Sequence, residues 1–254
     1  MTLLMPLNKL GAACLLLVMS IFSIASAQAP APVPAPTSSP SVPVTTYVVP
    51  EVLFKASPLP QWPQSAIAIE ADLQAVLAAQ ASRTPSDTQE ALLDAARGPL
   101  AWAQDAAGLG PTFTEQRYPA ATTLLLALHE DMRAVNRAAN LEKGYRVRPS
   151  GVDSRVKSIF ADNLNNSASY PSARSASSRV WALLLGDVFN LRRAALLAHA
   201  DRTAQLRLLG GAHFPSDIDA GKRLGDAYYS QVFADPSFQQ ALARARQEAA
   251  AAKP

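Results

Sequence analysis

One stretch near the C-terminal end of the chain combines residue types that could act on a phosphate group. It reads Arg-Leu-Leu-Gly-Gly-Ala-His-Phe-Pro-Ser-Asp and runs from Arg207 to Asp217, with His213 between them. An acid that accepts a hydrogen bond from one imidazole nitrogen leaves the other nitrogen free to attack. Arginine offers a fork of donors that suits phosphate oxygens, and paired glycines let the backbone approach a ligand closely. The stretch predicts His213 as a nucleophile oriented by Asp217; the alternative is that His213 caps one helix and Asp217 begins the next, without chemistry.

Two upstream segments place further arginines and a serine beside prolines. Tyr-Arg-Val-Arg-Pro, at 145–149, ends one expected helix, and Ser-Tyr-Pro-Ser-Ala-Arg, at 169–174, begins another. Ser172 is therefore expected near a helix N-terminus, where the backbone favours anions.

Together the three segments resemble the PAP2-type phosphatases, most closely the bacterial class A non-specific acid phosphatases. That family's pattern is Lys, six residues, Arg-Pro; then Pro-Ser-Gly-His; then Ser-Arg, five residues, His, three residues, Asp. The resemblance covers residues 129–247 and includes the ending Asp-Pro-Ser-Phe-Gln-Gln-Ala-Leu, which begins at Asp235. It implies an all-α fold, a PAP2-type bundle of about seven helices.

The resemblance also implies a role for each matching residue. His213 matches the histidine that takes the phosphoryl group as a phosphohistidine, and Asp217 matches the acid that orients and activates it. Arg148 and Arg207 match two arginines that clamp the phosphate. Ser172 matches the serine whose hydroxyl and amide contact the phosphate.

Four positions depart from the family pattern. Leu141 stands where the lysine of the first segment is expected, and Leu206 replaces the serine before the clamping arginine. Ala173 replaces a glycine, which would cost energy if a positive φ were required. Arg174 replaces the histidine that protonates the leaving group. Arginine stays protonated across the usual pH range and cannot act as a general acid there, although Arg174 could serve as a third phosphate-binding guanidinium.

These departures leave two hypotheses of different classes. The first is an acid phosphatase that hydrolyses phosphate monoesters through His213, slowed by the roughly 10²–10⁴-fold that loss of a general acid typically costs. The second is a non-catalytic relative that binds phosphate or a phosphorylated ligand. A vanadium-dependent haloperoxidase of the same fold is disfavoured, because those relatives also use the lysine and the second histidine that are replaced here. No metal and no cofactor are implied.

The remaining polar and aromatic candidates are interpreted as structural. No second histidine or cysteine lies at metal-ligand spacing from either other histidine. We expect a half-buried or surface position for His129, core positions for His199, Trp102 and Trp181, a solvated turn at Arg192-Arg193, and a surface salt bridge for Arg179.

Apolar residues recur at helical spacing over most of the chain, and no segment has the alternation typical of a strand. A Thr-Pro-Ser-Asp sequence at 84–87 predicts an N-cap, and Gly98-Pro99 predicts a break. Expected helices are 65–81, one that begins after Thr84, 119–140, 172–190, 192–209, 217–233 and 238–250.

The N-terminal region has the organisation of an exported protein. Residues 1–27 combine Lys9, an apolar run and an Ala-Ser-Ala ending, which predicts a cleaved secretory signal peptide. Residues 28–46 are rich in Pro, Ala and Ser and predict a disordered tether. Residues 47–254 form the expected phosphatase domain, with an irregular arm over 47–63. We expect a periplasmic or secreted protein, without lipidation at Cys14, because Gly11 stands where a lipoprotein signal needs Leu.

Composition limits the partners. The 254 residues are 49% apolar, enough for a sizeable core, and carry a formal net charge of +3, or 3 − 1 = +2 without Lys9. Such a small charge argues against nucleic acid as a partner. Without Cys14 the chain has no cysteine, so no disulfide can form. The expected partner is a small phosphorylated substrate or inorganic phosphate, with no stable membrane anchor after signal cleavage; a homo-oligomer stays open.

Overall fold

Helices make up nearly all of the regular structure. The computed structural model describes residues 46–105, 107–160 and 167–252, and these contain no strand. The predicted signal peptide (1–27) and most of the predicted tether (28–46) lie outside the described residues. The elements are α1 (Pro50–Ala56), α2 (Ala66–Ser82), α3 (Pro85–Ala96), α4 (Pro99–Ala103), α5 (Pro119–Lys143), α6 (Pro149–Val152), α7 (Ala173–Val188), the 3-10 helix η2 (Asn190–Arg192), α8 (Arg193–Leu209), α9 (Pro215–Phe233) and α10 (Pro236–Ala251).

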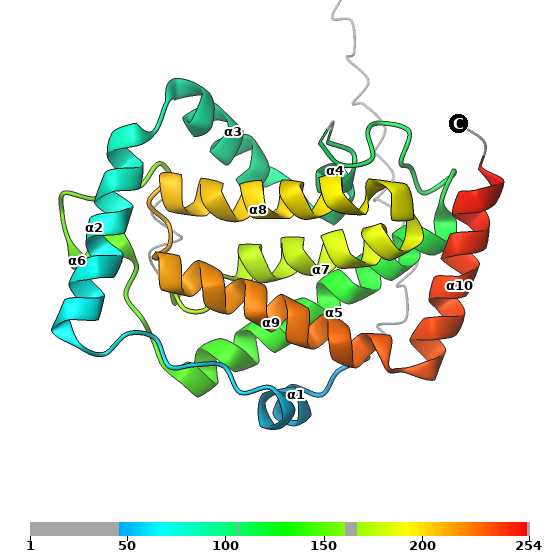
Figure 1. Cartoon of the computed structure of the whole chain (residues 1–254), viewed down its shortest axis with the longest axis horizontal. Coiled ribbons are helices and arrows are strands. Elements are labelled where there is room, and N and C mark those ends of the chain that lie inside the picture. Colours follow the sequence, from blue (N-terminus) through cyan, green and yellow to red (C-terminus); the bar gives the residue numbers. More distant parts are fainter. Residues whose placement is uncertain (1–45, 106, 161–166, 253–254) are drawn as a thin grey trace, which may run out of the picture. The chain divides into compact units, whose positions relative to one another are not determined.

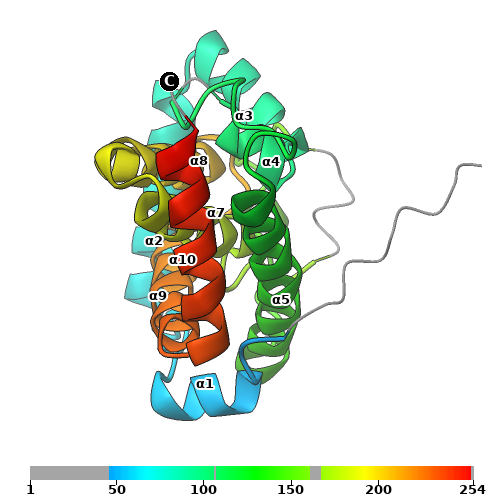
Figure 2. The same cartoon turned by 90° about the vertical axis from the view of Figure 1, so that its right-hand side faces the viewer.

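Helix α7 is the centre of the bundle. It lies between α8 and α9 in Figure 1, with α5 passing behind it, and it also contacts α10 and α4. Twelve of its 16 residues are buried, which only a helix covered on several sides allows. Figure 2 shows the same bundle from its side, with α5 and α10 upright and α1 below them. The core between these helices includes Leu128, Trp181, Leu184 and Tyr228.

Glycines in α9 bring it close to the start of α7. A Cβ on Gly221 would lie 2.4 Å from the carbonyl oxygen of Ser172, and one on Gly225 would lie 2.8 Å from that of Ala176. Any larger residue would therefore force the two helices apart. This contact places Ser172, at the N-terminus of α7, against the first turn of α9, where Asp217 lies.

Local signals fix most helix ends as the sequence predicts. Thr84 and Asp87 form a reciprocal capping box at the start of α3, and α4 begins after the predicted break, at Pro99. The Asp235 carboxylate caps α10. The seven predicted helices all form, with ends that differ by a few residues.

The prediction of a wholly irregular arm over 47–63 is wrong. Residues Pro50–Ala56 form α1, a helix of two turns. Pro50 at its first position has a φ already suited to a helix, and Glu51 and Lys55 lie at the ends where their charges favour the helix dipole. Only the flanking residues are irregular, and among them Val48 and Leu59 pack into the core.

Structural roles for several polar and aromatic residues are confirmed. Trp102 and Trp181 are buried, and the His199 ring stacks on Trp102 with 4.4 Å between ring centroids. Arg179 binds Asp226 at 2.7 Å on the surface.

Asp131 in α5 anchors the beginning of the described chain. Its Oδ2 accepts hydrogen bonds from the amides of Tyr47 (3.1 Å) and Val48 (3.2 Å) and from the hydroxyl of Tyr228 in α9 (2.9 Å). The carboxyl is buried, and burial raises its pKa against the effect of these three donors.

Replacing Asp131 with Ala should lower the free energy of unfolding by about 3 kcal/mol, because three buried donors lose their acceptor. Urea unfolding monitored by circular dichroism measures the change. Glu130→Ala, at an exposed position of the same helix, is the control and should change stability by less than about 0.5 kcal/mol. Equal effects of the two variants would contradict the anchoring role.

Candidate active site

His213 lies in the tight turn that joins α8 to α9. Gly211 has a φ of +73°, a conformation that favours glycine, and it reverses the chain just after Leu209. The predicted reason for the paired glycines, close approach to a ligand, is not the one observed. A Cβ on Gly210 would lie 2.3 Å from the ring of Phe160, so the absent side chain makes room for that ring. The turn leaves His213 only 3% exposed.

The imidazole of His213 is held by a backbone carbonyl rather than by Asp217. Nδ1 lies 2.8 Å from the carbonyl oxygen of Ser169, but 3.6 Å from the nearer oxygen of Asp217. A carbonyl can only accept, so Nδ1 carries the proton and Nε2 carries the lone pair. The predicted direct hydrogen bond from His213 to Asp217 is therefore absent at this geometry, whereas the predicted tautomer is the one that the contacts favour.

Arg148 covers the free nitrogen of His213. Its Nη1 lies 3.1 Å from Nε2 and donates to it. Burial lowers the pKa of His213 to about 4, with the neighbouring charges of Arg148 and Arg207 acting in the same direction and Asp217 against them. The ring is thus neutral at neutral pH, as nucleophilic attack requires.

Asp217 organises the groups around His213. It is fully buried, and it accepts hydrogen bonds from Ser169 Oγ (2.6 Å), from the Phe214 amide (2.9 Å) and from Arg146 Nη1 (2.6 Å). Burial opposes ionisation of the carboxyl, but its contacts with His213, Arg146 and Ser169 outweigh that effect and lower its pKa. Asp217 therefore acts on His213 directly, as a negative charge 3.6 Å from Nδ1, and it also holds Ser169, whose carbonyl accepts the hydrogen bond from Nδ1.

Arg146 is a site residue that sequence reasoning missed. Its guanidinium bridges Asp217 and Asp72, the latter at 2.7 Å, and lies 4.1 Å from the centroid of the Phe214 ring. Asp72 also accepts from the hydroxyl of Ser216. Asp72 comes from α2, outside the region of family resemblance, so no motif indicated it. For Arg146 the sequence offered one signal, its position two residues before the predicted phosphate ligand Arg148.

The predicted phosphate-clamping arginines are both buried and lack a carboxylate partner among the described residues. Arg148 donates to carbonyl oxygens of Ala212 (2.8 Å), Ser167 (3.1 Å) and Ala168 (3.2 Å), which carry no net charge. Arg207 is 5% exposed, its Nε has no hydrogen-bond partner, and its guanidinium lies 4.0 Å from the centroid of the Phe160 ring. Burial, with repulsion from Arg174 and Arg148, lowers the pKa of Arg207 to about 9.

Ser172 caps α7 and is buried beside Asp217. Its amide donates to the Asp217 carbonyl oxygen at 2.9 Å, so the amide that the resemblance assigns to phosphate already has a partner. Its Oγ accepts from the hydroxyl of Ser175 at 3.0 Å, which leaves its own proton available to a ligand. Ala173 begins the helix in ordinary helical conformation, so the predicted cost of losing a glycine there does not arise.

Arg174 is engaged elsewhere. It binds the buried Asp94 of α3 with two nitrogens, at 3.0 and 3.1 Å, and donates to the Arg97 carbonyl oxygen at 2.8 Å. Its role as a third phosphate ligand stays a prediction, but the charge that it would offer is neutralised by Asp94. Leu141, where the family lysine is expected, is 84% exposed at the end of α5.

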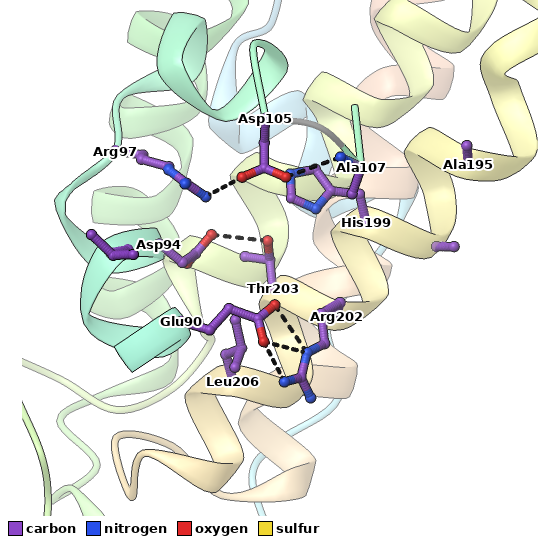
Figure 3. A pocket seen from close by; sticks show the side chains of 12 residues that line it. Glu90, Asp94, Arg97, Asp105, Ala107, Ala195, His199, Arg202, Thr203 and Leu206 are labelled. Carbon is purple, nitrogen blue, oxygen red and sulfur yellow. Dashed lines mark hydrogen bonds and ion pairs between the residues drawn. The ribbon is translucent and has the colours of Figure 1, made fainter. Parts of the chain in front are cut away.

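A hollow of about 540 Å³ lies between α3, α8 and the residues that follow α4, and Asp94 lines it (Figure 3). His213 does not line it. Its charged side chains pair with neighbours inside the hollow, which leaves no free charge for a ligand: Arg97 with Asp105, Arg202 with Glu90, and Asp94 with Thr203. We therefore place the candidate site at His213. Among the described residues no three His, Cys, Asp or Glu side chains gather as metal ligands, and no helix is long and apolar enough to cross a membrane.

Parts of the chain are similar to curated non-specific acid phosphatases. A non-specific acid phosphatase from Salmonella typhi is 34% identical over 87 residues, which cover 34% of this chain and 35% of that protein. One from Providencia stuartii is 29% identical over 147 residues, 57% of this chain and 59% of that protein. The chain therefore matches well under two thirds of the length of these curated relatives. No family model matches the chain.

A solved structure shares the fold. It is the first transmembrane PAP2 type phosphatidylglycerolphosphate phosphatase from Bacillus subtilis, with a TM-score of 0.50 and 18% identity over 75% of this chain and 92% of that one. At that identity the likeness concerns the fold alone. The predicted all-α, PAP2-type architecture is confirmed.

The protonation of His213 should make the protein lose stability in acid. Its pKa falls from an ordinary 6.5 to about 4 on folding, so the unfolded chain binds the extra proton between these values. Stability should drop as the pH falls from about 6.5 to 4, by up to about 3 kcal/mol from this residue. Urea unfolding in phosphate-free buffer across that range measures the slope.

His213→Asn should flatten this pH dependence, whereas His129→Asn, at a partly buried position, should leave most of it in place. An unchanged slope in His213→Asn would show that the histidine is not held neutral by the fold.

Proposed function

We propose that this chain, which is related to the PAP2-type phosphatases, is an exported acid phosphatase that hydrolyses phosphate monoesters through a phosphohistidine at His213. One observation carries the proposal: a neutral, buried imidazole presents its lone pair next to two buried arginines that have no carboxylate partner among the described residues. The named relatives support the reaction class, because they are non-specific acid phosphatases.

The charges of the site favour a bound anion. Buried charges without a partner are costly, so an arginine in that state stabilises a complementary ligand strongly. Among the described residues, neither Arg148 nor Arg207 has an ion pair, whereas Asp217 is bonded to Arg146, which it shares with Asp72. With His213 neutral, the cluster sums to 4 − 3 = +1, from Arg146, Arg148, Arg174 and Arg207 against Asp72, Asp94 and Asp217.

The proposed reaction has two displacements at phosphorus. Arg148 turns its Nη1 from His213 to a phosphoryl oxygen, which uncovers Nε2 for attack. A bond from Nε2 to phosphorus forms as the ester P–O bond breaks, and the imidazole becomes positively charged. The ester oxygen leaves with the electron pair of the broken bond. Nδ1 keeps its proton and donates it in a hydrogen bond to the Ser169 carbonyl, and Asp217, 3.6 Å away, stabilises the positive ring. Water then attacks phosphorus, releasing phosphate and restoring neutral His213.

The leaving group receives little help in this site. Arg174 occupies the position of the family's acid, and its protons are held by Asp94 and a backbone carbonyl. Alcohols that depart only when protonated should therefore react slowly, and aryl phosphates, whose anions are stable, should react best. We propose low efficiency for this reason, and export to the periplasm or medium because of the signal pattern in residues 1–27.

The second candidate is a protein that binds phosphate without turning it over. Two observations favour it: Arg148 covers the nucleophilic nitrogen, and Arg174, at the position of the family's general acid, is an arginine bound to Asp94. Against it stands the tautomer of His213, which binding alone does not need.

Turnover separates the two candidates. The purified protein should release p-nitrophenol from p-nitrophenyl phosphate in mildly acidic buffer, and His213→Ala should abolish the release. A second measurement exposes the protein briefly to substrate with a radiolabelled phosphate group and then denatures it in alkali, because phosphohistidine is acid-labile. Label should stay bound to the wild-type protein and not to His213→Ala. Activity that survives in His213→Ala would refute the assignment of the nucleophile.

Arg174→His should raise kcat for phenyl phosphate more than for p-nitrophenyl phosphate, because the poorer leaving group gains more from a general acid. The change leaves the buried Asp94 without its ion-pair partner Arg174. The double variant Arg174→His with Asp94→Asn is therefore the matched variant, because it keeps the region neutral. If neither variant nor the wild type turns over any aryl phosphate, the chain is a binder.

Phosphate binding tests the anion site directly. Arg207→Met should weaken the binding of inorganic phosphate, followed by calorimetry, at least about tenfold. Without phosphate, the same change should leave the free energy of unfolding unchanged or raise it, because it removes a buried, unpaired charge. Arg202→Met, on the same helix but paired with Glu90, is the control and should not alter phosphate affinity. A loss of stability without a loss of affinity would assign Arg207 a structural role instead.

A further inference from the structure

A second hollow, of about 490 Å³, lies between α5 and α7, which run side by side in the bundle (Figure 1). Its volume falls in the range of small-molecule sites. It adjoins the candidate active site, because Ala173 and Arg174 in its wall directly follow Ser172. A neighbouring hollow shares Arg137 with it and reaches Ala168, whose carbonyl oxygen accepts from Arg148 at 3.2 Å.

Several residues that line this hollow carry a buried polar atom without a hydrogen-bond partner among the described residues. Five buried side-chain nitrogens and oxygens among the described residues have no hydrogen-bond partner, and three of them belong to residues that line it. They are Nδ1 of His129, Oδ1 of Asn136 and Nε1 of Trp181. Asn136 is 5% exposed and Trp181 is 1% exposed. Native proteins rarely leave such atoms unpaired, so their concentration indicates a polar ligand.

The three atoms can serve a ligand that carries both donors and acceptors. The indole of Trp181 can only donate, and the amide of Asn136 presents either an oxygen or an NH₂ group when it rotates. Burial lowers the pKa of His129, so its ring is neutral and can donate or accept according to tautomer.

The walls of the hollow are positively charged. Arg133 and Arg137 project from α5, and Arg174 from α7. Arg133 is paired with Glu130 at 3.2 Å and Arg174 with Asp94, whereas Arg137 has no ion pair or hydrogen bond with the described residues. A negative group placed there would meet Arg137 without competing with a carboxylate of the chain.

We propose that this hollow binds the organic part of the ligand whose phosphate is held by Arg148 and Arg207, and that this organic part carries a second negative charge, such as a carboxylate. The inference rests on the proposed function, since it takes the phosphate position from it. It assigns Arg137 to the second charge, and Trp181, Asn136 and His129 to polar atoms between the two charges.

Binding of two phosphonates, which cannot be hydrolysed, tests the inference without any turnover. Calorimetry with the full mature chain should show 4-carboxybenzylphosphonate binding about fivefold or more tightly than benzylphosphonate, as expected for a partly exposed ion pair supported by hydrogen bonds. Arg137→Gln should remove most of this difference and leave the affinity for benzylphosphonate unchanged. Arg244→Gln, an exposed arginine on α10, is the matched control and should preserve the difference.

Trp181→Phe keeps an aromatic ring and removes the donor, so it should weaken the carboxylated compound selectively. Because that residue is buried, its thermal unfolding is measured alongside; Arg137→Gln, at an exposed position, is decisive if Trp181→Phe is unstable.

The outcomes separate this inference from the proposed function. Equal affinities of the two phosphonates, or a difference that Arg137→Gln retains, would overturn the inference and leave the phosphate site standing. Binding of the carboxylated compound that depends on Arg137 but not on Arg207 would keep the hollow as an anion site and overturn its coupling to the phosphate. Failure of both compounds to bind would overturn both proposals.

Discussion

The buried guanidinium of Arg146 holds the candidate site together. It joins Asp72 of α2 to Asp217 of α9 while stacking on the ring of Phe214, so three parts of the chain meet at one cation. Removing one partner of such a buried cluster leaves an uncompensated charge, which is far more costly than losing a surface pair. The orientation of His213 follows from it, because Asp217 holds Ser169 and Ser169 holds the imidazole.

The same pairing decides where the site is positive. Asp217 is bonded to Arg146 and makes no ion pair with Arg148, which bonds to neutral groups among the described residues. Arg207 lies next to an aromatic ring and has no ion pair with the described residues. The positive charge of these two arginines is therefore not offset by a carboxylate of the described residues, and it is complementary to a phosphate.

Short-range signals made much of this fold predictable. Caps and prolines at Thr84 and Asp235 act within a few residues, so the ends of α3 and α10 follow from sequence alone. Arg148, Ser172 and His213 each match a family motif, and these motifs predicted that the three residues belong to one site. Partners distant in sequence were not predictable: Asp72 lies 74 residues from Arg146, and Asp94 lies 80 residues from Arg174. No local pattern signals that either carboxylate is buried beside a particular arginine, and the direct bond expected between His213 and Asp217 depended on such detail.

The anchoring of the first described residues has a consequence for the order of folding. The amides of Tyr47 and Val48 and the hydroxyl of Tyr228 donate hydrogen bonds to Asp131. The Tyr47 ring packs edge-on against Phe238, with 5.6 Å between the ring centroids. A chain that emerges amino terminus first cannot complete this cluster until residue 238 is available. The beginning of the domain must therefore wait, without its final contacts, for almost the whole polypeptide to be delivered, and closure of the bundle becomes a late event in its biogenesis.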